Sequence, residues 1–329
     1  MFRRLSRLVW CVVAASGLAA VSASALAGAE SQYPQQAIRL VVATAPGGGG
    51  DMIARIFADG LSKELKQPVV VENKPGASGV IAATSVLRSA PDGYTLLLAV
   101  ATYVQVPAIQ KSFPFDPKSD FIPISLVARS SSVLLVNRKM GVKTVAELAA
   151  AMAANPTGFN FGSWGNGSTA HFMGELLNLK TNSKAAHVAY KGSGPMLTDL
   201  LAGVISFAFT DVGAAQPHLP SDRVLPLAVL GNRRIDSLPE VPTMGEAGFD
   251  GFDVVGWVGV LVPRGTPADI VAILERASVN AGKSARVRQR LTDLSLEPVG
   301  SNSAEFASHL QKDMATWAEI AEKAGMKAE

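Results

Sequence analysis

The segment 38–57, IRLVVATAPGGGGDMIARIF, constrains the fold more than any other part of the chain. A β-branched apolar run is followed by Pro46 and by four consecutive glycines at 47–50. After Asp51, apolar residues recur at the spacing of one helix face. The pattern predicts a strand, a loop of bare backbone and the start of a helix. Because backbone N–H groups can approach a ligand there and a helix N-terminus carries partial positive charge, the segment predicts an anion site.

The first residues have the pattern of a cleaved export signal. Three arginines precede an apolar run at 8–21, and small residues with two A-x-A sites follow. We expect a Sec-type signal peptide over residues 1–29, cleaved before Gly28 or Glu30, and hence a periplasmic protein. The run is too short to span a bilayer comfortably, and a membrane anchor is the alternative. No second long apolar run follows, so we expect a soluble chain with no stable membrane insertion after cleavage.

Charge and cysteine content exclude several classes of function. The chain has 30 Lys and Arg and 27 Asp and Glu, a net charge of +3. Removal of the leader, with its three arginines and no acid, leaves 27 of each, so the basic balance indicates targeting and no nucleic-acid partner. Cys11 is the only cysteine and lies in the leader, so we expect neither disulfide nor thiol chemistry. The remaining length allows one or two domains with a large core.

Apolar β-rich runs alternate with helical patterns, which favours α/β units with parallel sheets. Thr144 with Glu147 predicts a capping box, Thr266 followed by Pro267 predicts a helix start, and a C-terminal amphipathic helix is expected from Ser303. The expected strands are 38–43, 69–72, 95–100, 132–137, 160–162, 186–190, 205–210 and 224–230.

A second glycine-rich loop repeats the arrangement of the first. The segment 161–171, FGSWGNGSTAH, follows a short expected strand and precedes a helical pattern. Ligands of open α/β sheets bind at the carboxyl ends of strands. Two such loops therefore predict two α/β domains that face each other and hold a small anion from both sides.

Several motifs, weak alone but specific in their order, give the chain a family resemblance. They are YP at 33–34, PGGGGD at 46–51, VENKPGASG at 71–79, PDGYTLL at 91–97, GSWGNGS at 162–168 with His171, AYKG at 189–192 and LPEVPTMGEAG at 238–248. The chain resembles the periplasmic solute-binding component of tripartite tricarboxylate transporters, also called Bordetella uptake gene (Bug) proteins. The resemblance covers nearly all of the chain after the leader.

The resemblance implies a fold and a set of partners. The fold is an α/β, two-lobed periplasmic binding protein (Venus flytrap, type II-like) with mixed sheets, flanking helices and two hinge crossings, near 124–130 and 254–262. Lobe 1 would comprise 30–126 plus 255–329, and lobe 2 would comprise 127–254. The implied partners are a small carboxylate and a membrane permease with one large and one small subunit. We expect a monomer without a cofactor.

Family members bind small carboxylates through backbone and hydroxyl donors, without a dedicated Arg or Lys. This sequence departs from the family at Gly50, where Thr or Ser is common, and at 78–81, where a second Gly–Asn pair is frequent. The missing hydroxyl at Gly50 removes a possible donor. The identity of the ligand is therefore left open among dicarboxylates, amino acids, aromatic carboxylates and tricarboxylates.

The expected ligand-binding residues lie in loops of both lobes. They are Thr44, Pro46, Gly47, Gly48, Gly49, Gly50, Ala77, Ser78 and Thr102 in the first lobe, and Ser163, Trp164, Gly165, Asn166, Ser168, Thr169 and Asp211 in the second.

Each of these residues also has a structural interpretation. The glycines could form a plain turn, although four of them cost conformational entropy, and Asp51 is expected to cap the helix. Ser168 or Thr169 could only cap a helix, and Trp164 could only pack. Asp211 could accept from an amino or hydroxyl group of the ligand or order a loop.

The leading hypothesis is a carboxylate-binding protein that closes around its ligand and docks onto a permease. A secreted serine hydrolase is the alternative, built on Ser78 or Ser168 with a histidine and Asp211, although no G-x-S-x-G motif is present. The same fold could also serve an ABC importer or a sensor kinase. No metal site is expected because the histidines lack metal-ligand spacing, and His171 is expected to pack behind the loop.

Overall fold

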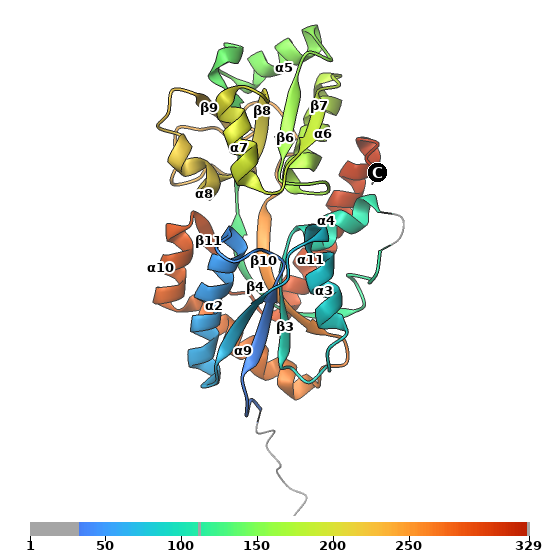
Figure 1. Cartoon of the computed structure of the whole chain (residues 1–329), viewed down its shortest axis with the longest axis vertical. Coiled ribbons are helices and arrows are strands. Elements are labelled where there is room, and N and C mark those ends of the chain that lie inside the picture. The colour runs from blue at the N-terminus through green and yellow to red at the C-terminus, as the bar shows by residue number, and fades with distance from the viewer. Residues whose placement is uncertain (1–32, 111–112, 328–329) are drawn as a thin grey trace, which may run out of the picture. The chain divides into compact units, whose positions relative to one another are not determined.

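The computed structural model describes residues 33–110 and 113–327, and within them six strands form the first sheet, in the order β11-β4-β10-β3-β1-β2 (Figure 1). β1 pairs in parallel with β2 and β3, whereas β10 and β11 run antiparallel to their partners. The bounds are β1 (Ile38–Val42), β2 (Val69–Asn73), β3 (Thr95–Val100), β4 (Phe121–Ser130), β10 (Gly256–Pro263) and β11 (Leu296–Pro298).

Five strands of the same described residues form the second sheet, in the order β7-β6-β8-β5-β9. β6 is parallel to β7 and β8, and β5 is antiparallel to β8 and β9. Parallel pairing is thus limited to three strands of each sheet, and both sheets are mixed. The bounds are β5 (Ser132–Asn137), β6 (Asn160–Ser163), β7 (Ala186–Ala189), β8 (Phe207–Asp211) and β9 (Val224–Val229).

Helices flank both sheets. With the first sheet lie α2 (Gly49–Leu65), η2 (Ala77–Gly79), α3 (Val80–Leu87), α4 (Thr102–Ile109), α9 (Ala268–Lys283), α10 (Ala285–Asp293) and α11 (Ser303–Lys323). With the second lie η3 (Arg138–Met140), α5 (Val145–Ala154), α6 (Thr169–Thr181), α7 (Ser193–Ala202), α8 (Val212–Ala215) and η4 (Gln216–His218). We call each sheet with its helices the first and the second lobe.

The starts of α5, α9 and α11 agree with the sequence pattern to within one residue. Thr144 caps α5, since its side chain accepts from the Glu147 N–H at 3.1 Å. α11 is capped by Asn302 with Glu305 in a capping box, one residue before the expected start. Thr266 does not cap α9, because its hydroxyl donates to the Pro263 carbonyl at 2.8 Å.

The chain crosses between the lobes along β4 and β10, as expected for a two-lobed fold with two crossings. Ser131 alone separates β4 from β5 of the second sheet. The sequence patterns did not predict β4 as a strand, because Pro123 lies within it and proline disfavours strand interiors. The β4–β10 ladder extends to the Ser130–Gly256 pair. The exact lobe boundaries at 126/127 and 254/255 stay a prediction.

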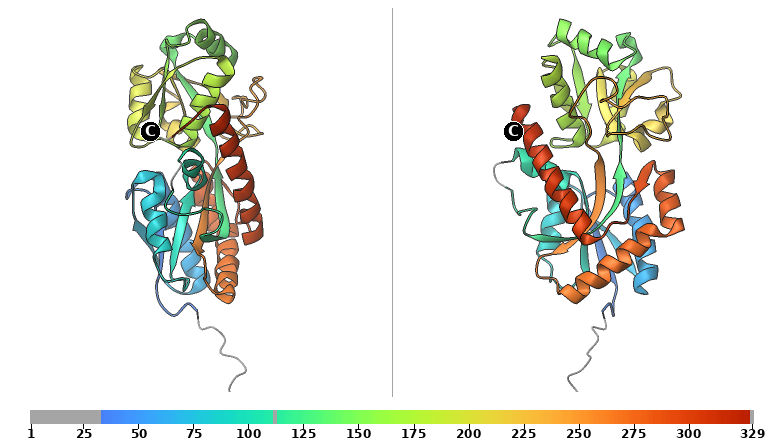
Figure 2. Two further views of the ribbon diagram at one scale, coloured as in Figure 1. Left: turned by 90° about the vertical axis from the view of Figure 1, so that its right-hand side faces the viewer. Right: turned by 180° about the vertical axis from the view of Figure 1, so that it is seen from behind.

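Residues 36–329 form one compact unit, and one apolar core runs through both lobes. α11 packs against β4 and α4 of the first lobe and against α6 of the second (Figure 2). At the α6 contact the rings of Phe172 and Trp317 lie 5.0 Å apart, edge to face. One turn earlier in α11, the buried Asp313 carboxylate accepts a hydrogen bond of 2.6 Å from the Trp257 indole N–H. α11 therefore fixes the position of α6 relative to the first sheet.

Within the described ranges, no helix is long and apolar enough to cross a membrane. The expected signal peptide lies outside the described residues.

The packing of β10 gives a prediction for stability. A Cβ added at Gly259 would lie 2.2 Å from Cζ of Phe306, a fully buried ring. We expect Gly259→Ala to lower the free energy of unfolding by about 1–3 kcal/mol, as overpacking does. Gly245→Ala is the matched control, because its nearest atom would be 3.8 Å away. Denaturant unfolding measures both, and equal stabilities would contradict this packing.

Candidate functional site

The carboxyl ends of two parallel strand triplets carry the expected ligand-binding residues. In the first lobe β1 lies between β3 and β2, and in the second β6 lies between β7 and β8. The loops that follow β1, β2 and β3 therefore leave the first sheet as neighbours, as do those after β6, β7 and β8 in the second. This is where ligands of open α/β sheets bind.

The glycine loop after β1 ends in an open helix N-terminus. Gly48 is the N-cap of α2, and the Met52 N–H donates to the Gly48 carbonyl at 3.0 Å. The N–H groups of Gly49, Gly50 and Asp51 precede that bond, and such groups at a helix start lack intrahelical partners. No side chain caps this end. The loop thus has the donors and the dipole of an anion site.

Asp51 is not the cap that the sequence predicted but the third residue of the helix. Its carboxylate accepts from Arg55 Nε at 3.0 Å, from the Gly47 N–H at 2.9 Å and from Asn73 Nδ2 at 2.9 Å. Asn73 also donates to the Thr44 carbonyl at 3.0 Å. These bonds hold the pKa of Asp51 well below its usual range, and the bond from Arg55 makes the largest contribution. The negative charge is thereby paired, and the loop is fixed to both α2 and β2.

Thr44 occupies the space that a side chain at position 50 would need. A Cβ at Gly50 would lie 2.8 Å from both Cγ2 and Oγ1 of Thr44. The Thr44 hydroxyl is buried and has no hydrogen-bond partner among the described residues. The Thr44 side chain therefore fills the space beside position 50 and favours glycine there.

The loop after β2 reaches the second lobe. Ala77 and Ser78 both have left-handed backbone angles, with φ of +45° and +49°, which costs non-glycine residues energy and is typical of functional loops. The Ser78 hydroxyl donates to the Asn166 carbonyl at 3.4 Å. A Cβ at Gly79 would lie 3.8 Å from Thr102 Oγ1, so this loop also adjoins the start of α4.

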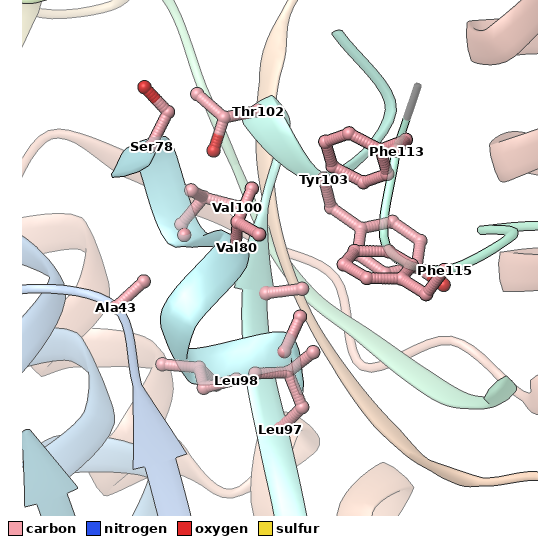
Figure 3. Close-up of a pocket in the computed structure, with 13 residues that line it drawn as sticks. Ala43, Ser78, Val80, Leu97, Leu98, Val100, Thr102, Tyr103, Phe113 and Phe115 are labelled. Atoms are coloured by element: carbon pink, nitrogen blue, oxygen red, sulfur yellow. The ribbon is translucent and has the colours of Figure 1, made fainter. Parts of the chain in front are cut away.

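A small cavity lies beneath this loop, within the first lobe (Figure 3). Ser78 and Thr102 lie at one end of it, and Tyr103, Phe113 and Phe115 form an aromatic wall. Its volume of about 20 Å³ has room for one water molecule. No residue of the second lobe lines it, so it is an apolar recess beside the interlobe loops and does not hold a whole ligand.

The second glycine-rich loop leads from β6 into α6. Ser168 caps the helix, its side chain accepting from the His171 N–H at 3.4 Å. Thr169 has another role, because its hydroxyl accepts from Gln105 Nε2 of α4 at 2.8 Å, and both side chains are buried. Gly167, with φ of +72°, fits closely against α4, where an added Cβ would lie 3.1 Å from Val106.

Ser163 lies at the end of β6, and its side chain is fully buried. Its hydroxyl accepts from the Gly165 N–H at 3.2 Å and lies 2.7 Å from His187 Nε2. Ser163 therefore shapes the loop from behind and does not face a ligand directly. Trp164 is half-buried and packs against the core that both lobes share and against a second apolar cluster of the second lobe, which supports its packing interpretation.

Asp211 ends β8, where it is paired in register with Ser132 of β5. Burial raises the pKa of Asp211 to about 6, although a hydrogen bond with the Ser132 side chain opposes the shift. A partly protonated carboxyl at a strand end can both donate and accept. Contacts join the first-lobe loops to one another and link Ser78 to Asn166, whereas no hydrogen bond joins Asp211 to a glycine loop within the described residues.

Three residues of the site were missed by sequence reasoning. Asn73 lies inside the VENKPGASG motif at the end of β2, and a polar residue at a strand end is the pattern that could have indicated its role. His187 and Gln105 gave no local signal, because their roles depend on partners that are distant in sequence. Among the described residues, no cluster of three or more His, Cys, Asp or Glu side chains could hold a metal ion, and the absence of a metal stays a prediction.

Two lobes with facing strand-end loops define a periplasmic-type solute-binding protein. The family model described as "Tripartite tricarboxylate transporter family receptor" matches residues 53–326, and the chain belongs to this family. The family and its periplasmic relatives of known structure indicate a periplasmic protein.

The relatives match the chain nearly from end to end. Protein BugT of Bordetella pertussis is 33% identical over 327 residues, 98% of either chain. The structure of R. palustris Rpa4515 with adipate is 32% identical, covers 90% of this chain and 99% of that one, and has a TM-score of 0.82. MatC from Rhodopseudomonas palustris with bound malate is 31% identical over 88% and 99% of the two chains, with a TM-score of 0.77.

The contact between Thr44 and Gly50 gives the second prediction. We expect Gly50→Ser to lower the free energy of unfolding by about 1–3 kcal/mol, because the new Cβ displaces a stiff β-branched side chain. Adding Thr44→Ala removes both atoms at 2.8 Å and leaves Cβ at an ordinary 3.4 Å. The double variant should therefore regain most of the loss in thermal unfolding. A double variant as unstable as Gly50→Ser would contradict this arrangement.

Proposed function

We propose that this protein captures a small organic carboxylate between the glycine loops of its two lobes and delivers it to a tripartite tricarboxylate-type membrane transporter. The observation that carries the proposal is the direct contact between the loops, from Ser78 to Asn166, beside the open N-terminus of α2. Two relatives about one-third identical hold adipate and malate. Both ligands are dicarboxylates, and each can present one carboxylate to each lobe.

The charge balance of the loops favours recognition by dipoles rather than by ion pairing. Arg55 is the cation of the glycine loop, and it is bonded to Asp51. Backbone N–H groups and hydroxyls then supply the donors, which agrees with a neutral charge balance after the leader. A ligand with contacts to both lobes stabilises the closed arrangement selectively, which is how a hinge-bending receptor closes.

The membrane partner is a permease with one large and one small subunit, and the receptor acts as a monomer. Family membership supports this partner. A role with an ABC importer or a sensor kinase would use the same site, and complex formation with co-expressed permease subunits distinguishes these cases.

Calorimetry with a carboxylate panel tests ligand capture. We expect adipate or malate to bind at pH 7 and solution scattering to show compaction on binding. Gly49→Asp is expected to weaken binding at least tenfold, or about 1.4 kcal/mol, because it places a negative charge at the anion site. The variant should fold, since a Cβ at Gly49 meets nothing within 4 Å and an acid is favourable in a first helical turn.

Gly245→Asp makes the same charge change outside the glycine loops, at a position with its nearest atom 3.8 Å away, and should leave affinity unchanged. The proposal would be wrong if no carboxylate caused binding and compaction, or if Gly49→Asp and Gly245→Asp bound the ligand with equal affinity.

The structure contains a serine–histidine pair that bears on the hydrolase alternative. It is Ser163 with His187, whereas the Ser78 and Ser168 hydroxyls have no histidine ring as partner in the described part of the chain. Ser163 is fully buried and bonded to the backbone of Gly165. A substrate would have to displace the loop to reach it, so we infer that the protein is not an enzyme.

Labelling with a fluorophosphonate tests this inference. Intact-mass spectrometry is expected to show no adduct after prolonged incubation at pH 7. A stoichiometric adduct on the wild-type protein that disappears in Ser163→Ala would instead support a hydrolase.

A further inference from the structure

Two histidines lie stacked directly behind the second glycine-rich loop. The rings of His171 on α6 and His187 on β7 are nearly parallel, at 8°, with centroids 3.9 Å apart. Phe161 stacks on the other side of His187 at 5.0 Å. Each histidine contacts one part of the loop that leads from Ser163 to Ser168.

The two contacts hold both ends of the loop. At the far end, the Gly167 N–H donates to His171 Nδ1 at 3.1 Å. At the near end, His187 Nε2 lies 2.7 Å from the Ser163 hydroxyl, which also accepts from the Gly165 N–H. Because Gly165 and Gly167 have φ of +136° and +72°, the loop adopts a conformation that depends on such external bonds.

The bond from Gly167 to His171 requires a neutral imidazole. His171 Nδ1 accepts a hydrogen bond, so its proton lies on Nε2, which faces Glu175 Oε1 at 4.0 Å. The Ser163 hydroxyl donates to the Gly165 carbonyl at 3.1 Å, so His187 Nε2 carries a proton and donates to Ser163. A proton added to Nδ1 of His171 would face the Gly167 N–H donor, and two charged rings at this separation would repel each other.

The surroundings favour the neutral form. Burial lowers the pKa of His171 to about 4, and burial together with the neighbouring His171 ring lowers the pKa of His187 to about 4. The ionisable groups that face the pair are Glu175 on α6, whose own pKa burial raises, and each histidine for the other. Among the described residues, no charged group of β6, β8, α5 or α11 shifts the pKa of either ring.

We propose that the stacked, neutral His171–His187 pair is a positioning element of the ligand site, which fixes the loop 163–168 in its binding geometry and releases it when His171 takes up a proton. The inference deepens the proposed function and rests on it for the link to ligand affinity. The loop's dependence on the pair can be measured without any ligand.

The decisive variant replaces both histidines with isosteric, non-titrating amides. In His171→Asn the amide oxygen can accept from Gly167 in place of Nδ1, and in His187→Gln the amide nitrogen can reach Ser163 in place of Nε2. His171→Phe keeps the stack and removes the acceptor. His218→Gln, at the other histidine of the second lobe, is the matched control.

Amide hydrogen exchange of the ligand-free protein is the first readout. Protection of segment 163–168 is expected to fall in the wild type between pH 7 and pH 4, after correction for intrinsic rates, and to stay constant in the double amide variant. His171→Phe should lower this protection at least threefold at pH 7 and leave α11 unchanged. Equal pH dependence in the wild type and the double variant would overturn the proposal.

Calorimetry with adipate and malate is the second readout. The ratio of wild-type to double-variant affinity should fall about twofold from pH 7 to pH 4, since a group at its pKa is half protonated. Titration of the ligand's own carboxylates cancels in this ratio. A constant affinity ratio together with pH-dependent protection of the loop would contradict the link between the histidine pair and ligand binding. If the wild type binds neither acid, the proposed function fails, and the hydrogen-exchange result alone decides whether the histidine pair positions the loop.

The free energy of unfolding should decrease at low pH for the same reason. Histidine in the unfolded chain has a pKa of about 6.5, and burial lowers the pKa of both rings to about 4 in the folded protein. The unfolded state therefore binds more protons between these values. The contribution of the two neutral histidines to the free energy of unfolding is fully present above pH 6.5 and is lost as the pH falls toward 4. Thermal unfolding should show a smaller loss in the double amide variant than in His218→Gln, and equal losses would contradict burial of a neutral pair.

Discussion

The antiparallel ladder between β4 and β10 is the constraint on which the rest of the structure depends. It runs from the Phe121–Pro263 pair to the Ser130–Gly256 pair. At its end a Cβ on residue 256 would lie 2.3 Å from Ser130 Oγ, so a larger residue there would force the Ser130 hydroxyl to rotate away. Ser131 alone then separates β4 from β5, and this short connection places the second sheet beside the carboxyl ends of β1, β2 and β3. The facing loops follow from this topology.

Within those loops, charge is paired or suppressed so that the backbone can supply the polarity of the site. Asp51 is bonded to Arg55, and the two histidines behind the second loop are held neutral by burial. What remains available are N–H groups at helix starts and buried hydroxyls such as that of Thr44. Dipoles held in fixed positions distinguish the shape of an anion better than a mobile lysine does, because their direction and not only their charge must match.

The glycine loops and several helix caps could be predicted from the sequence, because each depends on residues near one another in the chain. The two-lobed α/β fold was predicted from the pair of glycine loops and from the family resemblance. Thr144 and Glu147 are three residues apart, and their bond is present. Features that depend on distant partners were not predictable: Asn73 acts through Asp51, and His187 acts through Ser163. β4 was not predicted for a local reason, because Pro123 lies within the strand. Asp51 itself was misassigned as a cap because the pattern could not show that the helix begins two residues earlier, at Gly49.

The two places where the lobes meet have unequal strengths, and this inequality determines which one can open. On one side Gln105 bonds to Thr169, both buried, and Phe172 packs on Trp317. On the other, Ser78 and Asn166 are exposed and share one long bond of 3.4 Å. A buried polar pair is costly to separate because each partner would lose its hydrogen bond, whereas water replaces the exposed bond at little cost. The contact between Ser78 and Asn166 therefore breaks first on opening, and contacts of a ligand with both loops stabilise the closed arrangement.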